Sequence, residues 1–437
     1  MKSSWAALLA LLLPSITSPA FDGLTLYRER NGWCADSARI WLSLEVKGLQ
    51  YTEVRELSGL PRLQLANGRV HGSNDGFESL IRSLDSAYPD SPPLWPPVGV
   101  GEPAVAEMVS AFDLAMPTNA REDRRAGFLF CRDEGFLYDP LPRATFEATL
   151  DAANELLARH DDGAFFCGAV FSAADVAWAP QLEKYAAQLP CLYPGLWPRC
   201  NDRWPKLARW YEAMDGVAPY ACRVKGDAMS WRKVLSTAPW WPSGWPARGG
   251  PDERGDPRGG VLEATEDEAA AAYGAAPVSE DLWASYAAGR PHVAPSAALE
   301  AAAMLMRNVE AVTRDAIQYR ALPADSSASD YDDALRMLVA ILMAEDSGAE
   351  GRAEGSLYGA TGSVSDGDGA VSAMAVSAMA SYLDDRICVP RDMGAPPAAA
   401  IREVRARFSA LASSDGCTSE ATATTTTTTT ARQVNRF

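Results

Sequence analysis

The chain has 437 residues and a formal net charge of −17, with 40 lysines and arginines against 57 aspartates and glutamates. At about 150 residues per domain, this length predicts two or three domains. The hydrophobic content of 47% is ordinary for a globular protein and too high for a disordered one. The acidic balance argues against a nucleic-acid-binding surface, because phosphate contacts need lysine and arginine. It also disfavours binding to anionic lipid, which would repel the negative charge.

Histidines and cysteines are arranged in a way that disfavours a metal centre. The three histidines, His71, His160 and His292, are far apart in the sequence, and no two of the eight cysteines form a C-x-x-C pair. We therefore expect no metal, no Ser-His-Asp triad and no dithiol redox motif. The cysteine density is far below that of a disulfide scaffold. The even number of cysteines is still compatible with disulfide bonds in an exported protein, and the sequence does not decide between the two.

The first twenty residues have the pattern of a leader peptide. Lys2 precedes the apolar run Trp5–Leu13, and Ser18-Pro19-Ala20 places small residues before a cleavage point. This predicts a signal peptide over 1–20 and export to the secretory pathway. The Ala20-Phe21 junction also resembles the plastid leaders of algae. A fortuitous helix and a cytoplasmic protein are the alternatives, and the apolar run is too short for a stable membrane anchor.

Residues 24–98 alternate between strand and helix patterns. Strands are predicted at 24–27 and 51–55, with a helix over 35–47 between them that ends at Gly48. Asn67-Gly68 predicts a hairpin between strands 62–65 and 69–71, and a helix follows over 74–88. The predicted order is therefore strand, helix, strand, hairpin, helix.

The rest of the chain is predominantly helical. Residues 103–235 have helical patterns, including an amphipathic stretch over 145–160 and a capping box formed by Ser172 and Asp175. Proline and glycine predict a linker over 236–260. An Ala-rich helical extension follows over 261–412, interrupted by a loop at 348–370, and a disordered Thr-rich tail is predicted over 413–437. Apolar stripes at helical spacing run through residues 299–316, 335–342 and 401–411 of this extension.

Cys34 is the candidate nucleophile because it lies between a predicted strand and the helix that follows. A thiol at a helix N-terminus faces unpaired backbone N–H groups and the positive end of the helix dipole, which favour the thiolate. A lone cysteine is more often an inert core residue. Ser37 stands where a C-x-x-C motif would have its second cysteine, so only a monothiol route is available locally.

Two further segments strengthen this candidate site. Leu60-Pro61 precedes the hairpin, where a cis proline of a thioredoxin-like sheet presents a backbone edge to the reactive cysteine. Gly72 and Ser73 begin the segment that opens the next helix, whose free N–H groups can bind a carboxylate, although an ordinary N-cap is the simpler interpretation. Together these features predict a site for a short anionic thiol peptide.

The residues 26–34 and 39–48 resemble the N-terminal domain of cysteine-type glutathione transferases, the omega, lambda and dehydroascorbate-reductase-like branch. By this resemblance, Cys34 corresponds to the catalytic cysteine, Pro61 to the cis proline and Ser73 to the serine that holds the γ-glutamyl carboxylate. The segment Phe166–Asp175 is similar to the F-x-G-x-x-x-S-x-x-D pattern of the helical domain, in which Ser172 and Asp175 are structural.

The resemblance implies an α+β fold and an enzymatic activity. The expected fold is a thioredoxin-like glutathione-binding domain over 21–98, an all-α domain over 103–235 and the extra helical extension. The implied enzyme is a glutathione-dependent thiol transferase or oxidoreductase with a monothiol cysteine. Leu60, Pro61, Gly72 and Ser73 would bind glutathione as co-substrate, the second substrate would be an electrophile or a disulfide, and a homodimer is an option.

The sequence also departs from the family pattern. Ala35 and Asp36 replace a proline and an aromatic residue, and the Asp36 charge opposes the thiolate, although Arg39 one turn on can offset it. Gly72 replaces a glutamate, and only residues 56–60 separate the second strand from Pro61, where the family has a helix. These differences motivate a non-catalytic binding or scaffold protein as the alternative, and a secreted protein with Cys34 in a disulfide as a third hypothesis.

The segment Arg386–Gly394 resembles a C-terminal extension of some glutathione-transferase-like proteins of algae, plants and cyanobacteria. Its residues predict a helix end, a turn at Val389-Pro390 and a new helix. No chemistry follows from this segment.

Overall fold

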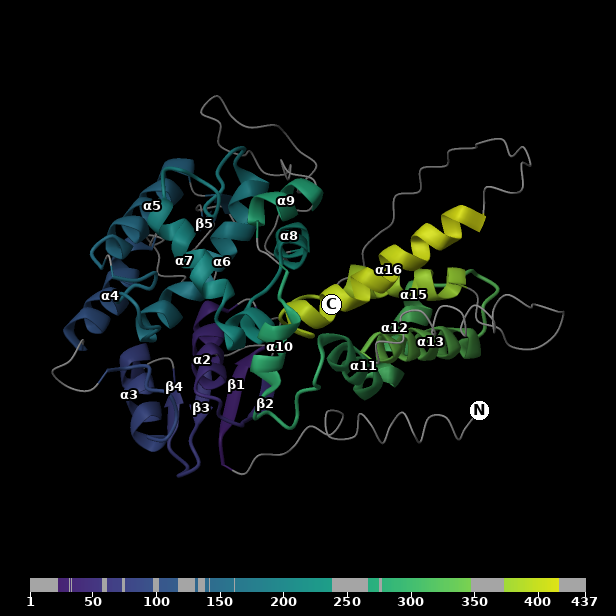
Figure 1. Ribbon diagram of the computed structural model, residues 1–437, viewed down its shortest axis with the longest axis horizontal. Helices are drawn as coiled ribbons and strands as arrows, with labels where there is room; N and C mark the ends of the chain where they lie inside the picture. The colour runs from purple at the N-terminus through teal and green to yellow at the C-terminus, as the bar shows by residue number, and fades with distance from the viewer. Residues whose placement is uncertain are drawn as a thin grey trace.

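The computed structural model describes residues 23–30, 32, 34–56, 61–72, 75–96, 102–116, 130–132, 138–140, 142–160, 162–237, 266–274, 277–346 and 373–415 (Figure 1). The predicted leader, the linker from residue 238 on, the loop at 348–370 and the tail from residue 416 on lie outside these ranges.

A four-stranded sheet forms the N-terminal part. Its strands are β1 (Thr25–Glu29), β2 (Thr52–Glu56), β3 (Arg62–Gln64) and β4 (Val70–Gly72), in the spatial order β2-β1-β3-β4. β1 is parallel to β2 and antiparallel to β3, which is antiparallel to β4. Helix α2 (Ala35–Val46) connects β1 to β2, and α3 (Phe77–Ala87) follows β4. This is the predicted thioredoxin-like order.

Both predicted turns are confirmed. Gly48 lies beyond the end of α2 at φ +64°, and its N–H donates to the Glu45 carbonyl while the Leu49 N–H donates to the Leu44 carbonyl. This pair of bonds satisfies the last carbonyl groups of the helix in a left-handed cap that glycine adopts without strain. In the hairpin, Gly68 has φ +81° and the Leu65 N–H donates to the Arg69 carbonyl at 2.8 Å.

The start of α3 differs from the prediction. The helix begins at Phe77 with Gly76 as its N-cap, which is three residues later than expected. The Asp75 carboxylate accepts the Gly72 N–H at 2.9 Å, so it bonds back to the end of β4 instead of capping the helix. Gly76 has φ +77° and provides the chain reversal between the two elements.

The helices of the second part surround α6. They are α4 (Glu102–Ala115), α5 (Arg143–Leu157), α6 (Ala173–Leu192), α7 (Pro205–Asp215), the π-helical turn η2 (Tyr220–Val224) and α8 (Ala228–Thr237). A short hairpin, β5 (Phe130–Arg132) and β6 (Tyr138–Pro140), was not predicted. α6 packs against α2, α4 and α8, and nearly all of its side chains are buried. The sheet domain and the helical domain therefore share one continuous hydrophobic core, which we call the first core.

The extension contains helices with a second core. They are α9 (Glu266–Tyr273), α10 (Glu280–Ala287), α11 (Ala297–Arg307), α12 (Val309–Tyr319), α13 (Ala328–Asp346), α15 (Ala373–Arg386) and α16 (Ala395–Asp415). The predicted stripes of α13 and α16 are buried at Leu335, Leu338, Ile401 and Val404. The stripe expected to run through residues 299–316 is divided at Asn308, whose side chain donates to the Met304 carbonyl at 2.9 Å.

The first two helices of the extension pack with the preceding domain. Ala269 and Tyr273 of α9 are buried in the first core, and Tyr286 of α10 donates to Glu45 Oε2 of α2 at 3.2 Å. The packing boundary therefore lies after α10, whereas the sequence placed a boundary at residue 261. α11 to α16 form the second body in Figure 1. No helix within the described ranges is long and apolar enough to span a bilayer.

Candidate functional site

Cys34 occupies the N-cap position of α2. Its Sγ accepts the Ser37 N–H at 3.4 Å, so the thiol is held against the first turn of the helix as the sequence predicts. The Ser37 hydroxyl in turn accepts the Glu29 N–H at 3.2 Å, which fixes the helix start to the end of β1. The Cys34 thiol is half-buried and free. The thiol therefore faces an N–H donor and the positive end of the α2 dipole.

The sheet topology brings three of the predicted site residues to one end of the sheet. Cys34 follows the C-terminal end of β1, Pro61 directly precedes β3, and Gly72 ends β4 opposite Arg62 in the ladder. Because β3 runs antiparallel to both neighbours, these three positions lie at the same end of the sheet. Leu60 and Ser73 lie outside the described residues, and so does the peptide bond before Pro61.

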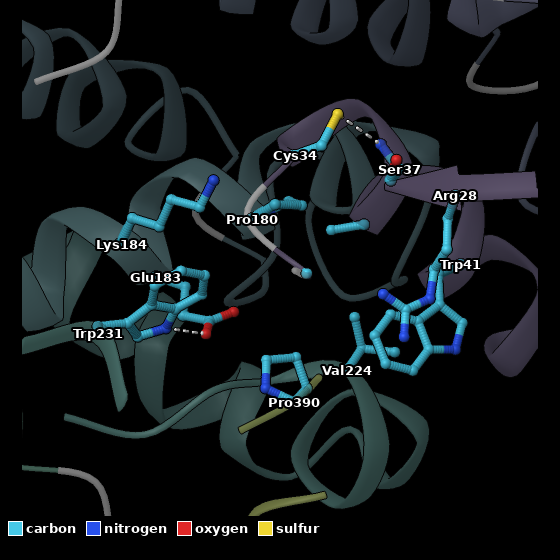
Figure 2. A pocket seen from close by; sticks show the side chains of 12 residues that line it. Arg28, Cys34, Ser37, Trp41, Pro180, Glu183, Lys184, Val224, Trp231 and Pro390 are labelled. Atoms are coloured by element: carbon cyan, nitrogen blue, oxygen red, sulfur yellow. Dashed lines mark hydrogen bonds between the residues drawn. The ribbon is translucent and has the colours of Figure 1, made fainter. Parts of the chain in front are cut away.

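A small cavity lies beside the thiol (Figure 2). Its walls come from β1, α2, α6, η2, α8 and the extension, through Arg28, Gly32, Cys34, Ser37, Ala38, Trp41, Pro180, Glu183, Lys184, Val224, Trp231 and Pro390. Its volume is about 10 Å³. This is barely enough for one water molecule, whereas small-molecule sites typically hold about 300–1,000 Å³.

The extension closes one side of this cavity. Pro390 contributes to the wall, and its carbonyl accepts from Arg223 Nη1 at 3.3 Å. The Val389 N–H donates to the Ser230 hydroxyl at 2.8 Å, which joins the same turn to α8. A Cβ added at Gly32, just before the nucleophile, would lie 3.6 Å from the Arg391 Cα. The segment 386–394, to which the sequence assigned no chemistry, thus lies against the loop that carries Cys34.

A buried ion pair forms the wall on the β1 side. Arg28 Nη2 lies 2.8 Å from Glu53 Oε1, and the guanidinium lies 4.5 Å from the Trp41 ring centroid. Burial raises the pKa of Glu53, but Arg28, Arg55 and Arg223 outweigh this and hold it below its ordinary value. For Arg28, burial has the opposite effect and lowers the pKa of the guanidinium. The Arg28 charge is therefore matched by Glu53 and is not directed at the thiol.

Asp36 is offset as the sequence predicts. Arg39 Nη1 lies 3.3 Å from Asp36 Oδ1, across one turn of α2. The same guanidinium donates through Nε to the Ala177 carbonyl at 2.9 Å and lies 4.1 Å from the Phe112 ring centroid. Arg39 therefore also fastens α2 to the helical domain.

Lys184 and Glu183 are site residues that sequence reasoning missed. Both line the cavity from α6, and Lys184 Nζ lies 5.3 Å from the Trp231 ring centroid. Glu183 accepts from Trp231 Nε1 at 2.7 Å and from the Gly226 N–H at 2.5 Å, and burial raises its pKa. The signal was present in the sequence, because these are the only charged residues of α6 beyond Asp175.

Ser172 and Asp175 form the predicted capping box at the start of α6. The Ser172 hydroxyl accepts the Ala174 N–H at 3.3 Å, and Asp175 Oδ2 accepts the Ser172 N–H at 3.0 Å. Asp175 Oδ1 also accepts from the Phe166 N–H at 3.1 Å and from Trp210 Nε1 at 2.9 Å. Both residues therefore position α6, the helix that carries Lys184. Within the described ranges, no three metal-ligating side chains cluster.

Comparisons with known proteins bear on the helical domain. Residues 141–213 match the family model described as glutathione S-transferase, C-terminal domain. The match spans α5, α6 and α7 with the capping box at its centre. This part of the chain is glutathione-transferase-like. No curated protein matches the chain.

Solved structures of this kind are similar to about half of the chain. Maleylpyruvate isomerase from Pseudomonas aeruginosa PAO1 has 23% identity over 45% of this chain and 96% of its own, with a TM-score of 0.31. Maleylacetoacetate isomerase from Anaeromyxobacter dehalogenans 2CP-1, with bound GSH, has 20% identity over 45% and 92%, with a TM-score of 0.33. At these scores the likeness carries no argument about activity, and the matches do not distinguish a cysteine-type branch.

Proposed function

We propose that the protein is a glutathione-dependent thiol transferase in which Cys34 is the nucleophile. The observation that carries this proposal is the position of the Cys34 Sγ at the start of α2, where it accepts the Ser37 N–H. Pro61 and Gly72 lie at the same end of the sheet. The match of residues 141–213 to the glutathione S-transferase C-terminal domain supports glutathione as the co-substrate.

The reaction is a pair of thiol–disulfide exchanges. The Cys34 thiolate attacks the glutathionyl sulfur of a mixed disulfide, forms a Cys34–glutathione disulfide and expels the other thiol as its thiolate, which takes a proton from water. The thiolate of a second glutathione then attacks the glutathionyl sulfur of this adduct. Glutathione disulfide leaves, and the Cys34 thiolate is restored. Ser37 replaces a resolving cysteine, so glutathione itself is the reductant.

The proposed glutathione site lies at the end of the sheet near Cys34. We propose that the backbone at Leu60 and Pro61 pairs with the peptide and that Gly72 and Ser73 hold its γ-glutamyl carboxylate. Ser73→Ala is expected to weaken glutathione binding more than it lowers the free energy of unfolding. Calorimetric titration and urea denaturation of the same variant measure both quantities, and unchanged affinity would refute the role of Ser73.

The nucleophile assignment is tested by turnover of hydroxyethyl disulfide and dehydroascorbate with glutathione. Cys34→Ser should reduce turnover by at least about 100-fold, because a hydroxyl does not replace a thiolate nucleophile. Cys200→Ser is the matched control, since Cys200 is an exposed free thiol that does not line the cavity. Turnover that survives in Cys34→Ser refutes the assignment.

The small cavity favours a second candidate function, a glutathione-binding or scaffold protein without turnover. Pro390 closes the space beside Cys34, and the Asp75 carboxylate already accepts the Gly72 N–H. Retention of wild type and Cys34→Ser on glutathione-agarose, without Cys34-dependent turnover of either substrate, would support this second function over the first.

We further propose that residues 1–20 direct the protein to the secretory pathway or the plastid. A fluorescent fusion of residues 1–30 should leave the cytosol, and a fusion of residues 21–50 is the control that lacks the leader. A cytosolic signal from the first fusion would contradict export.

A further inference from the structure

We infer that the turn Val389–Arg391 of the extension restricts the second substrate of Cys34 to small disulfides and excludes glutathionylated proteins. The inference rests on the function proposed above, because it names the substrate class of the same site. The sequence motifs around Cys34 do not indicate this turn, which is distant in sequence and connects α15 to α16.

The turn forms a wall of the cavity beside the thiol. Figure 2 shows Pro390 across the cavity from Cys34, and both residues line a space of about 10 Å³, which is barely enough for one water molecule. A Cβ added at Gly32 would lie 3.6 Å from the Arg391 Cα, so the backbone of the turn also lies close to the loop before the thiol. Because the proline ring locks its own φ angle and cannot swing aside, this wall can retreat only if the backbone moves.

Hydrogen bonds from the helical domain hold that backbone in place. Arg223 Nη1 of η2 donates to the Pro390 carbonyl at 3.3 Å. The Val389 N–H donates to the Ser230 hydroxyl of α8 at 2.8 Å, and Ser230 is fully buried. Arg223 is itself anchored, because its Nη2 lies 3.7 Å from Glu53 Oε2. The turn is therefore bonded to the helical domain at two successive residues.

A chain of ion pairs connects the same attachment to α16. At the start of α8, Asp227 Oδ1 accepts the Ser230 N–H at 2.7 Å, and Asp227 Oδ2 accepts from Arg402 Nη1 at 2.7 Å. Arg402 Nε also donates to Asp384 Oδ1 at 2.7 Å, and the Asp384 side chain is only 3% exposed. Because α15 and α16 carry Asp384 and Arg402 and belong to the second core, a substrate that displaced the turn would have to disturb buried contacts of both bodies.

A fixed wall beside the thiol selects substrates by size. The leaving thiol of a small mixed disulfide, such as the one that glutathione forms with hydroxyethyl disulfide, extends only a few bonds beyond the attacked sulfur. A glutathionylated protein presents the same disulfide on a broad surface, which would collide with the turn before the disulfide reached Cys34. This discrimination comes from a clash with the wrong substrate rather than from additional contacts with the right one.

The first experiment compares labelling of Cys34 in the full chain by N-ethylmaleimide and by the rigid, bulky fluorescein maleimide, followed by peptide mass spectrometry. The exposed thiol of Cys200 is the internal reference. In wild type, the bulky reagent should be at least about tenfold more disfavoured at Cys34 than at Cys200. Pro390→Gly should reduce this difference to about threefold or less. Pro323→Gly alters an exposed proline of the second body and should leave the difference unchanged.

Ser230→Ala is the second variant, because it removes the hydrogen bond from Val389 without changing the turn itself. It should reduce the difference at least about twofold. An equal ratio of the two reagents at Cys34 and Cys200 in wild type overturns the inference, and so does a ratio that neither variant changes. Failure of N-ethylmaleimide to label Cys34 also overturns it, because the site would then be closed to small molecules. Should Pro390→Gly fail to fold by circular dichroism, an unchanged ratio in Ser230→Ala alone overturns the inference.

The second experiment measures turnover of hydroxyethyl disulfide and of glutathionylated serum albumin with glutathione. In wild type, kcat/KM should be at least about tenfold lower for the protein substrate, and Pro390→Gly should narrow this preference. Equal kcat/KM for the two substrates overturns the inference and leaves Cys34 as the nucleophile. Turnover that survives in Cys34→Ser refutes the proposed function instead, whereas the labelling ratios need no glutathione and still decide whether the turn selects by size.

Discussion

Gly394 lies directly against the carbonyl group of Cys222. A Cβ added at Gly394 would lie 1.9 Å from the Cys222 oxygen, a distance that no side chain can adopt. Gly394 directly precedes α16, and Cys222 belongs to η2, so this contact is where the turn of the extension meets the glutathione-transferase-like domain. Close backbone approach, rather than an unusual φ, explains why glycine is needed here.

The first prediction is that Gly394→Ala displaces the turn that carries Pro390. Because the Cys222 carbonyl belongs to backbone, the added methyl group should cost about 1–3 kcal/mol of free energy of unfolding. The turn should move away from Cys34, so alkylation of Cys34 should become faster. Urea denaturation and iodoacetamide kinetics measure the two effects. Ala399→Ser, at an exposed position of α16, is the control. Slower alkylation in Gly394→Ala would contradict this account of the cavity wall.

The second prediction concerns the carboxylate that occupies the end of β4. Asp75 Oδ2 accepts the Gly72 N–H at 2.9 Å, next to the position proposed for the γ-glutamyl carboxylate. Removing this exposed charge in Asp75→Asn should raise glutathione affinity about threefold, since exposed charges typically interact by about 0.2–1 kcal/mol. Titration calorimetry measures the affinity, with the exposed Asp90→Asn as control. Weaker binding in Asp75→Asn would mean that the carboxylate organises the site instead.

The third prediction is that Asp175 stabilises the fold through its acceptors. Asp175→Ala leaves the buried Phe166 N–H and Trp210 Nε1 without an acceptor and removes half of the capping box. The expected loss is about 3 kcal/mol of free energy of unfolding, which urea denaturation detects. Asp175→Asn retains an acceptor oxygen and should lose less. If the two variants were equally destabilised, the negative charge rather than the acceptor geometry would be the important property.

The fourth prediction is a pH dependence of stability with a defined sign. Burial raises the pKa of Asp175 from 3.8 to about 6, although the hydrogen bonds from Phe166, Trp210 and Ser172 oppose the shift. Between pH 3.8 and about 6, the folded state therefore binds more protons than the unfolded state. The contribution of Asp175 falls as the pH rises through this window, by on the order of 2–3 kcal/mol, and is constant above it.

Comparison of wild type with Asp175→Asn across this window checks the sign. The amide does not titrate, so wild type should lose stability relative to the variant as the pH rises toward about 6. A relative gain by wild type over the same window would mean that the hydrogen bonds outweigh burial.

Local signals explain which parts of the fold could be predicted. Gly48 and Asn67-Gly68 determine turns through their own backbone preferences, and Ser172 with Asp175 caps a helix through contacts within one turn. The late start of α3 was missed because Asp75 bonds to Gly72 across the turn, a choice between two local acceptors that periodicity does not resolve. The break at Asn308 was missed because the apolar stripe continues through it.

The same distinction between local and long-range contacts applies to the residues of the candidate site. Cys34 and Ser37 could be placed from the strand-to-helix pattern, since their contact spans one helical turn. Lys184 and Pro390 could not, because they reach the cavity only through the packing of α6 and of the extension against α2. Contacts between residues so distant in sequence depend on the assembled core rather than on local preference.

The burial of Tyr273 has a consequence for how the chain is made. The ring centroid of this α9 residue lies 5.2 Å from the cations of both Arg199 and Lys225. Its hydroxyl donates to the Gly226 carbonyl at 3.4 Å. The first core is thus incomplete until a segment beyond residues 238–260 has been synthesised. A domain that folds during translation must wait for α9 to leave the ribosome, so its nascent form spends longer with α6 and α8 uncovered and open to chaperones.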